Sequence, residues 1–340
     1  MKSKIIIFCQ APADIPHVLS LYEKYKDEKI ISIFVVNVEN VFKFIKSLDL
    51  HLDSLVFIPY TLKSFKNSFQ IFVERKRIIN LKKQYFNSVV DTDVYFFSRF
   101  EDWLTSSFLK SLSKRNTIYY LDHYDFSSEL FNKHKLTFKT FIMKVIFYIL
   151  TDVSFKLEII EKIPEFNYLN YKIERKIPEI NPEIFHKYQY EIDIEKNEKP
   201  IVLFFIMPCE ASIYDCESHD KIQFRVIHSF KKYGWNVVVK GHPRLGVPEN
   251  IMSMVDVQIP SYIPAEFLQI KDVQMCSGII TAALAHFARN TKIKTYSLIN
   301  LFQFKKSTSA KLYKDYLSGL SGNQVVFFES FSDFENNIKN

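Results

Sequence analysis

Residues 201–207 and 235–244 read IVLFFIM and WNVVVKGHPR, two mostly apolar runs of which the second ends abruptly in polar and cationic residues. Continuous apolar content of this kind is typical of strands in parallel sheets that helices cover on both faces. Helices and strands alternate around these two runs. The pattern predicts helices at 221–232, 264–270 and 281–289, and a final polar helix. It predicts strands at 255–259, 273–276, 293–298 and 325–328. This alternation predicts an open α/β domain.

The first 125 residues alternate in the same way. Short β-branched or aromatic runs begin at Ile5, Ile31, Ser54, Asp93 and Thr117, and helical segments separate them. Four prolines (Pro164, Pro178, Pro182 and Pro200) then interrupt a charged stretch without periodicity, which favours a connection between domains. With 340 residues and 47% hydrophobic content, the chain suits two domains. We therefore predict an N-terminal domain at 1–157, a connection at 158–199 and a C-terminal domain at 200–340.

Composition and cysteine spacing limit the class of protein. The four cysteines are scattered without a CxxC spacing, which predicts reduced thiols, no disulfide and no zinc. The start, MKSKIIIF, lacks the pattern of a signal peptide, so we expect a cytoplasmic protein. The net charge of +7 suits an anionic substrate or membrane surface. The lysines form no single arm, which disfavours nucleic acid as a partner. The oligomeric state stays open.

The longest apolar stretch, FIMKVIFYIL at 141–150, is about half the length needed to cross a bilayer and contains Lys144. It follows the basic stretch KHKLTFK. Two interpretations stay open: a core helix, or a basic amphipathic helix that lies on the inner face of an anionic membrane.

Glycine placement excludes the common nucleotide loops. All six glycines lie at or after Gly234, so the first domain cannot hold a GxGxxG loop, and GxxxxGK[ST] occurs nowhere. A nucleotide site would therefore be in the second domain, built from strand ends and helix N-termini.

The stretch KGHPR gives the first candidate site. In open α/β sheets, ligands bind beyond the carboxyl ends of the strands, where His242 is expected. Gly241 and Pro243 restrict the backbone around the imidazole, while Lys240 and Arg244 add the positive charge that an anion site needs. The alternative is a solvated turn.

Two further segments are expected at the same edge. Glu266 follows Pro264 at the start of a predicted helix, where it would accept hydrogen bonds from ribose hydroxyls or simply favour the helix dipole. Ser277 and Thr281 precede the next helix, so their hydroxyls and the helix N–H groups would form an anion cradle. A helix cap explains Ser277 equally well.

The order of these motifs resembles the bacterial lipooligosaccharide sialyltransferases (glycosyltransferase family 52). The similar features are the His-Pro pair after a strand, Pro-x-Glu at the next helix, and a hydroxyl before Ala-Ala-Leu. In the first domain, SRFEDWLTSSFLKSLSKRNTIYYLDHYDFSSEL is similar to the segment that leads to the family's two-acid-then-glycine motif, with Asp122 in the first acid position. The resemblance extends over most of both domains.

This resemblance implies a GT-B fold, in which two Rossmann-like domains face a central cleft. It implies CMP-sialic acid as donor, a glycolipid or oligosaccharide with terminal galactose as acceptor, and no cofactor or metal. His242 would serve the phosphate leaving group, and Glu266, Ser277 and Thr281 would face the nucleotide. Lys240, Pro243 and Arg244 of the predicted anion site would complete the donor site. Asp122 would be the base that activates the acceptor hydroxyl, and Asp215 competes for that role.

The chain departs from the family at three positions: His123 and Tyr124 replace the second acid and the glycine, and Ala282 follows Thr281 where a second hydroxyl is expected. Other functions therefore stay open. One is transfer of another CMP- or CDP-activated group, such as a related nonulosonate or a polyol phosphate. Another is a non-catalytic GT-B subunit of a polysaccharide assembly system.

Overall fold

The computed structural model describes residues 3–61, 68–97, 102–122, 138–153, 171–192, 194, 198–243, 245–269 and 271–339. The chain divides into two compact units, Met1–Ile184 and Phe185–Asn340. Each unit has its own six-stranded sheet and its own hydrophobic core.

The sheet of the first unit is parallel throughout. Its strands are β1 (Lys4–Cys9), β2 (Ile30–Val36), β3 (Ser54–Ile58), β4 (Asp93–Phe96), β5 (Thr117–Leu121) and β6 (Glu174–Lys176). They are ordered β3-β2-β1-β4-β5-β6, so the direction of winding reverses between β1 and β4. This is the strand order of a Rossmann fold.

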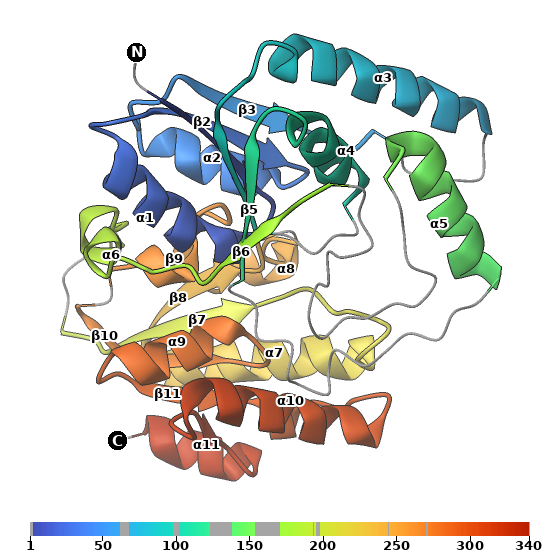
Figure 1. The fold of residues 1–340 in the computed structure, drawn as a ribbon. Helices are drawn as coiled ribbons and strands as arrows, with labels where there is room; N and C mark the ends of the chain where they lie inside the picture. The colour runs from blue at the N-terminus through green and yellow to red at the C-terminus, as the bar shows by residue number, and fades with distance from the viewer. Residues whose placement is uncertain are drawn as a thin grey trace. The chain divides into compact units, whose positions relative to one another are not determined.

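Helices cover both faces of this sheet because side chains alternate along each strand. The helices are α1 (Ile15–Tyr25), α2 (Glu39–Ser47), α3 (Ser68–Phe86), α4 (Trp103–Leu112) and α5 (Phe138–Thr151), with a 3-10 turn, η1 (Pro12–Asp14). The short helix α6 (Glu183–Lys187) contains the boundary between the two units. Ile6 and Phe8 of β1 share one core cluster with side chains of α3, α4 and α5. These three helices pack against one another, and Figure 1 shows them together, apart from α1 and α2.

The second unit repeats the same topology. Its strands are β7 (Ile201–Ile206), β8 (Asn236–Gly241), β9 (Val257–Ile259), β10 (Val273–Gly278), β11 (Lys294–Ser297) and β12 (Val326–Phe327), ordered β12-β11-β10-β7-β8-β9 and all parallel. Its helices are α7 (Cys216–Lys232), α8 (Glu249–Met252), α9 (Ala282–Asn290), α10 (Ser307–Ser321) and α11 (Phe331–Ile338), with 3-10 turns η3 (Ala265–Phe267) and η4 (Ile299–Leu301). Here the reversal lies between β7 and β10.

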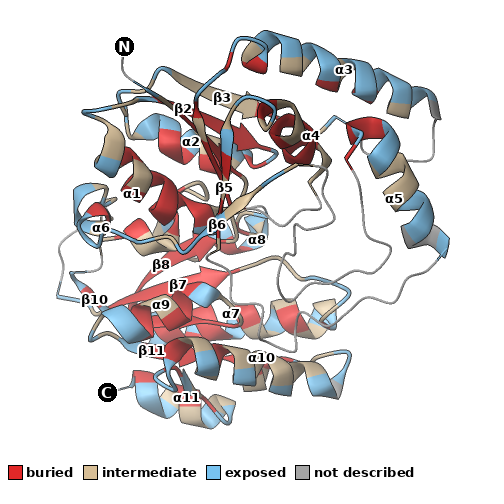
Figure 2. Cartoon of the chain, in the orientation of Figure 1, coloured by how far each residue is buried: buried red, intermediate tan, exposed pale blue. Residues whose placement is uncertain are grey.

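The predicted α/β class with two Rossmann-like domains is confirmed by these strand orders. The strands of the sheet centres were predicted to within two or three residues, and β7 is buried along its whole length, as its apolar run requires (Figure 2). One strand was not predicted: β6 lies inside the stretch 158–199 that the sequence favours as a connection, and it pairs with β5. The prediction that the two sheets face each other across a cleft stays a prediction.

The cysteine prediction is wrong for one pair. Cys209 and Cys216 form a disulfide, with their Cα atoms 5.4 Å apart, while Cys9 and Cys276 are free and buried. The bond joins the loop after β7 to the first residue of α7. The chain reverses there, since the amide of Tyr214 donates to the carbonyl of Glu210. That reversal brings the two thiols together without any spacing motif.

Among the described segments, no helix combines the length and apolar character needed to cross a membrane.

The disulfide predicts a measurable loss on removal. A double variant, Cys209→Ser with Cys216→Ser, should lower the free energy of unfolding by about 2 kcal/mol, because a short loop in the unfolded chain is no longer closed. Urea unfolding with and without dithiothreitol measures this. The reductant should destabilise the wild type by a similar amount and leave the double variant unchanged. Equal unfolding curves for wild type and variant would contradict the expectation.

Candidate functional site

The carboxyl ends of β7, β8 and β10 form the candidate site, which lies within the second unit. Parallel strands end at the same edge of a sheet, and the crevice where the strand order reverses is the usual ligand position in such folds. His242 directly follows β8, and Thr281 stands at the start of α9, which follows β10. The topology therefore brings these two predicted residues to one sheet edge.

A tight turn fixes the backbone of His242. The amide of Gly246 donates to the carbonyl of His242 at 2.8 Å, and Gly246 has a φ of +71°, which favours glycine. A Cβ on Gly241 would lie 2.6 Å from the carbonyl carbon of Gly246, so only glycine fits where the turn folds back. Pro243 is half-buried within the turn, and Arg244 lies outside the described residues. The two glycines, not the proline alone, hold the turn.

Lys240, which the sequence predicts to add positive charge beside His242, is buried. Its side chain is 3% exposed, and its Nζ donates to the carbonyls of Gly241 (2.9 Å) and Ser261 (3.1 Å). Burial lowers the pKa of Lys240 to about 8, while the nearby carboxylate of Glu266 acts in the opposite direction. The ammonium group of Lys240 thus lies beneath the turn, where its hydrogen bonds connect two backbone segments.

Glu266 connects this lysine to a histidine that the sequence did not single out. Glu266 lies in η3, which packs against α9. Its carboxylate interacts with Lys240 and with His286 of α9, where burial lowers the His286 pKa and Glu266 opposes that shift. The ring of His286 also contacts Phe185. The signal available in the sequence was a histidine inside the apolar pattern of AALAHF, which usually indicates a core residue.

The two predicted hydroxyls have different positions. Thr281 is the N-cap of α9, and its Oγ1 accepts a hydrogen bond from the amide of Ala283 at 3.3 Å. Ser277 lies inside β10, which extends two residues further than predicted. It is fully buried, and its Oγ has no hydrogen-bond partner in the described part of the chain. Thr281 is therefore the hydroxyl at the helix start, and the expectation that Ser277 faces the sheet edge is wrong.

Asp215 acts as a helix cap. It is exposed at the N-cap of α7, where its carboxylate accepts a hydrogen bond from the amide of Ser218 at 3.2 Å. Its own amide donates to the carbonyl of Gln303. These contacts account for an aspartate at this position without a catalytic role.

Asp122 belongs to the first unit, directly after β5. Its amide donates to the carbonyl of Lys176. Its carboxylate pairs with Arg175, whose Nε (3.0 Å) and Nη2 both donate to the same oxygen, Oδ2. The edge strand β6 thus supplies both contacts. His123 and Tyr124, the departures from the family motif, lie outside the described residues.

A cluster of polar residues around Asp102 in the first unit was not predicted. Asp102 is the N-cap of α4 and accepts hydrogen bonds from the side chains of Gln10 and Tyr60 and from two backbone amides. Burial raises its pKa, and these hydrogen bonds oppose the shift. Gln10 also donates to Thr105 at 2.7 Å. The cluster lies where β1 and β4 diverge, and its members are far apart in the sequence, which hid it from motif analysis.

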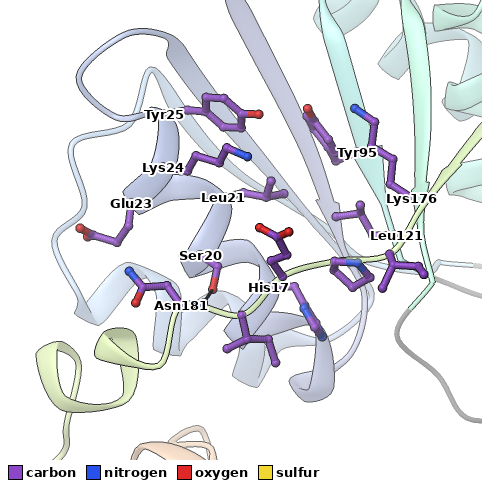
Figure 3. A pocket seen from close by; sticks show the side chains of 14 residues that line it. His17, Ser20, Leu21, Glu23, Lys24, Tyr25, Tyr95, Leu121, Lys176 and Asn181 are labelled. Atoms are coloured by element: carbon purple, nitrogen blue, oxygen red, sulfur yellow. Dashed lines mark hydrogen bonds between the residues drawn. The ribbon is translucent and has the colours of Figure 1, made fainter.

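The first unit also contains a cavity of about 460 Å³ (Figure 3). It lies beside α1, and its wall includes Lys24, Tyr25, Tyr95 and Lys176. The backbone amide of Asn181 donates to the Ser20 hydroxyl at 3.0 Å, which ties the segment after β6 to α1 along one side. No residue predicted for the site lines this cavity.

Within the described segments, no three His, Cys, Asp or Glu side chains are grouped so that they could hold a metal ion.

No protein-family model and no curated protein matches the chain. Solved structures with a similar fold include the glycotransferase of kitacinnamycin, with 8% identity, a TM-score of 0.48, and coverage of 99% of this chain and 89% of that chain. They also include the Rickettsia bellii UDP-N-acetylglucosamine 2-epimerase, with 9% identity, a TM-score of 0.47, and coverage of 95% of this chain and 89% of that chain. A third is the Acinetobacter baumannii MurG, with 9% identity, a TM-score of 0.41, and coverage of 99% of this chain and 88% of that chain. Because these TM-scores lie below 0.5, the fold assignment rests on the strand orders. The resemblance to the sialyltransferase family stays a prediction.

The turn predicts that Gly241→Ala is destabilising. The added Cβ overlaps the backbone of Gly246, so the turn must open, at a cost of about 2 kcal/mol or more. Gly319 of α10 is the matched control, because no atom lies within 4 Å of its added Cβ. Gly319→Ala should stabilise the protein by up to about 1 kcal/mol. Urea unfolding of both variants measures the contrast, and equal effects would contradict the turn geometry.

Buried Lys240 predicts a specific dependence of stability on pH. Its folded pKa is about 8, whereas an unfolded lysine titrates near ~10.4. Between these values the unfolded chain binds a proton that the folded chain lacks, so stability rises with pH. The wild type should gain about 1 kcal/mol per pH unit over Lys240→Met in this window. Exposed Lys294→Met is the control, and a constant difference between wild type and Lys240→Met would contradict the prediction.

Proposed function

We propose that this protein is an inverting, metal-independent glycosyltransferase that binds a nucleotide-activated sugar at the carboxyl edge of the second unit's sheet. The observation that carries the proposal is the position of His242. It follows a buried strand directly, and a turn that needs glycine at two positions holds its backbone at the edge where ligands of such folds bind. In the proposed mechanism, His242 acts on the phosphate leaving group.

The chemistry of the edge suits a phosphate leaving group. A glycosyl bond to phosphate breaks with charge developing on the departing oxygen, which a proton donor or nearby cation stabilises. The His242 imidazole would supply the proton, and the buried Lys240 charge would add positive potential from below. The N–H groups at the start of α9, next to Thr281, offer hydrogen bonds to the phosphate oxygens. Glu266 would accept hydrogen bonds from the ribose hydroxyls.

The acceptor hydroxyl needs a base, and we assign this role to Asp122. Its carboxylate would take the hydroxyl proton as the acceptor oxygen attacks the anomeric carbon, while the bond to phosphate breaks on the opposite side. This single displacement inverts the anomeric configuration. The ion pair with Arg175 keeps the Asp122 carboxylate oriented. Because both Arg175 hydrogen bonds go to Oδ2, the other oxygen, Oδ1, would accept the proton.

For the donor we propose CMP-sialic acid and for the acceptor a terminal galactose of a lipooligosaccharide or O-antigen glycan. The support is the order of three motifs: His-Pro, Pro-x-Glu, and the hydroxyl before Ala-Ala-Leu. The loss of the second acid at His123 keeps a related CMP-activated nonulosonate, or a CDP-activated polyol phosphate, as the alternative donor.

A CMP-release assay tests the proposal directly. Wild-type protein with CMP-sialic acid and a lactose-type acceptor should release CMP in the presence of EDTA. His242→Ala should lower kcat by ~10²-fold or more, because proton transfer to the leaving group is lost. His228→Ala is the matched control, since His228 is an exposed histidine on α7 of the same unit; it should keep wild-type turnover.

The outcomes separate the alternatives. Release from labelled CDP-glycerol but not from CMP-sialic acid would favour the polyol-phosphate transferase. Folded protein that binds CMP but turns over neither donor would favour a non-catalytic role. Full activity of His242→Ala would overturn the mechanism.

A further inference from the structure

The α5 helix presents an apolar stripe to solvent. Phe138, Phe141, Ile142, Tyr148 and Ile149 are all exposed, and Phe138 is 80% exposed. Their spacing of three, four and seven residues places them on one face of the helix. The opposite face contributes Leu150 and Ile146 to the core of the first unit. A core helix would bury such a stripe, so the alternative of a surface-binding helix gains support.

The neighbouring α3 helix adds a second exposed apolar group. Phe69 and Phe72, at 73% and 74% exposure, lie with Val73 near its N-terminal end, while Ile78 and Phe86 on its other side are buried. The two helices contact each other, and both show exposed faces in Figure 2. Large exposed apolar groups on adjacent helices usually mark an interaction site.

These two helices are strongly basic. The α3 sequence holds five Lys or Arg and one Glu, and α5 holds two Lys, so seven positive charges and one negative give a net charge of +6. The whole chain has a net charge of +7. The single acid, Glu74, is buried and paired with Arg77 at 2.8 Å. The net positive charge of the chain is therefore concentrated on two helices that also carry three highly exposed phenylalanines.

The cations of this region repel one another. Burial lowers the pKa of Lys82 to about 8, and nearby Lys110, Lys114 and Arg75 act in the same direction. Asp152, paired with Lys110 at 2.9 Å, opposes the shift. An anionic partner would relieve this repulsion.

We propose that the exposed faces of α3 and α5 form a membrane-docking surface for a bilayer rich in anionic phospholipid. Phe69, Phe72, Phe138 and Phe141 would enter the headgroup region, and Lys76 and Lys83 of α3 would contact lipid phosphates. A second copy of the chain fits less well, because a symmetric interface would place two +6 surfaces against each other. The inference is independent of the proposed catalytic function.

Sedimentation with vesicles tests the proposal on the full chain. The protein should bind vesicles of phosphatidylglycerol and phosphatidylcholine, bind pure phosphatidylcholine much more weakly, and lose affinity as salt is raised. Phe69→Ser with Phe72→Ser, and Phe138→Ser with Phe141→Ser, should each weaken binding at least tenfold. Val326→Ser with Met252→Ser is the matched control, because it replaces exposed apolar residues of the second unit.

Charge-reversal variants distinguish the effect of the positive charge on α3 from the effect of the net charge of the whole chain. Lys76→Glu with Lys83→Glu should weaken binding at least tenfold, since each basic residue near an anionic surface contributes about a fivefold change in affinity. Lys271→Glu with Lys292→Glu makes the same change in net charge at exposed positions of the second unit and should bind nearly as the wild type does.

A mild variant provides a readout that does not depend on weakened binding. In Phe141→Trp, the new indole should shift its emission to the blue with anionic vesicles and be quenched by brominated lipid, beyond any change from Trp103 and Trp235. Absence of binding to anionic vesicles would overturn the proposal. The proposal would also be overturned if the α3 and α5 variants bound vesicles as the wild type does. It would likewise be overturned if the variants changed the self-association of the protein and not its binding to vesicles.

Discussion

Parallel pairing is the constraint on which both units depend. Every strand pair in the two sheets is parallel, so the chain must return to the opposite end of the sheet after each strand, and the helices that do so cover the faces. Strand interiors are therefore apolar, and polar groups collect where strands end. In the second unit this brings His242, Glu266 and Thr281 to one edge although they are distant in sequence. The site follows from topology before any side-chain contact is considered.

Lys240 is the exception to this rule, since it is a charged residue in a buried strand. An ammonium removed from water without partners costs several kcal/mol, and here two backbone carbonyls and the field of Glu266 offset that cost. Valine, as at the three preceding positions, would avoid the cost altogether. A lysine there braces the carbonyl of Ser261 against β8 and keeps positive potential beneath the His242 turn, which an apolar residue cannot do.

The sequence predicted what depends on continuous patterns. The run at 201–207 predicted β7 almost to the residue, because a strand buried on both faces must be apolar throughout. The edge strand β6 reads Glu-Arg-Lys and has no such signal, since two of its three residues are exposed. The sequence allowed Ser277 to be a helix cap, but β10 continues to Gly278, where the missing side chain lets the strand approach Phe205, and Thr281 is the cap instead. His286, the Asp102 cluster and the disulfide depend on contacts between distant segments, which a single sequence does not specify.

The two units share a strand order but use their first loops differently. All six glycines belong to the second unit, while left-handed positions in the first are taken by Asn37, Asp49, Asp91 and Asp152. In a nucleotide-binding Rossmann unit, the amides after the first strand are free to bind phosphate. Here the buried carboxylate of Asp14 accepts hydrogen bonds from the amides of Gln10 (2.7 Å) and Ala11 (2.9 Å). The Asp14 carboxylate thus takes hydrogen bonds that a phosphate would accept in a nucleotide-binding unit. This supports the proposal that the donor binds to the second unit.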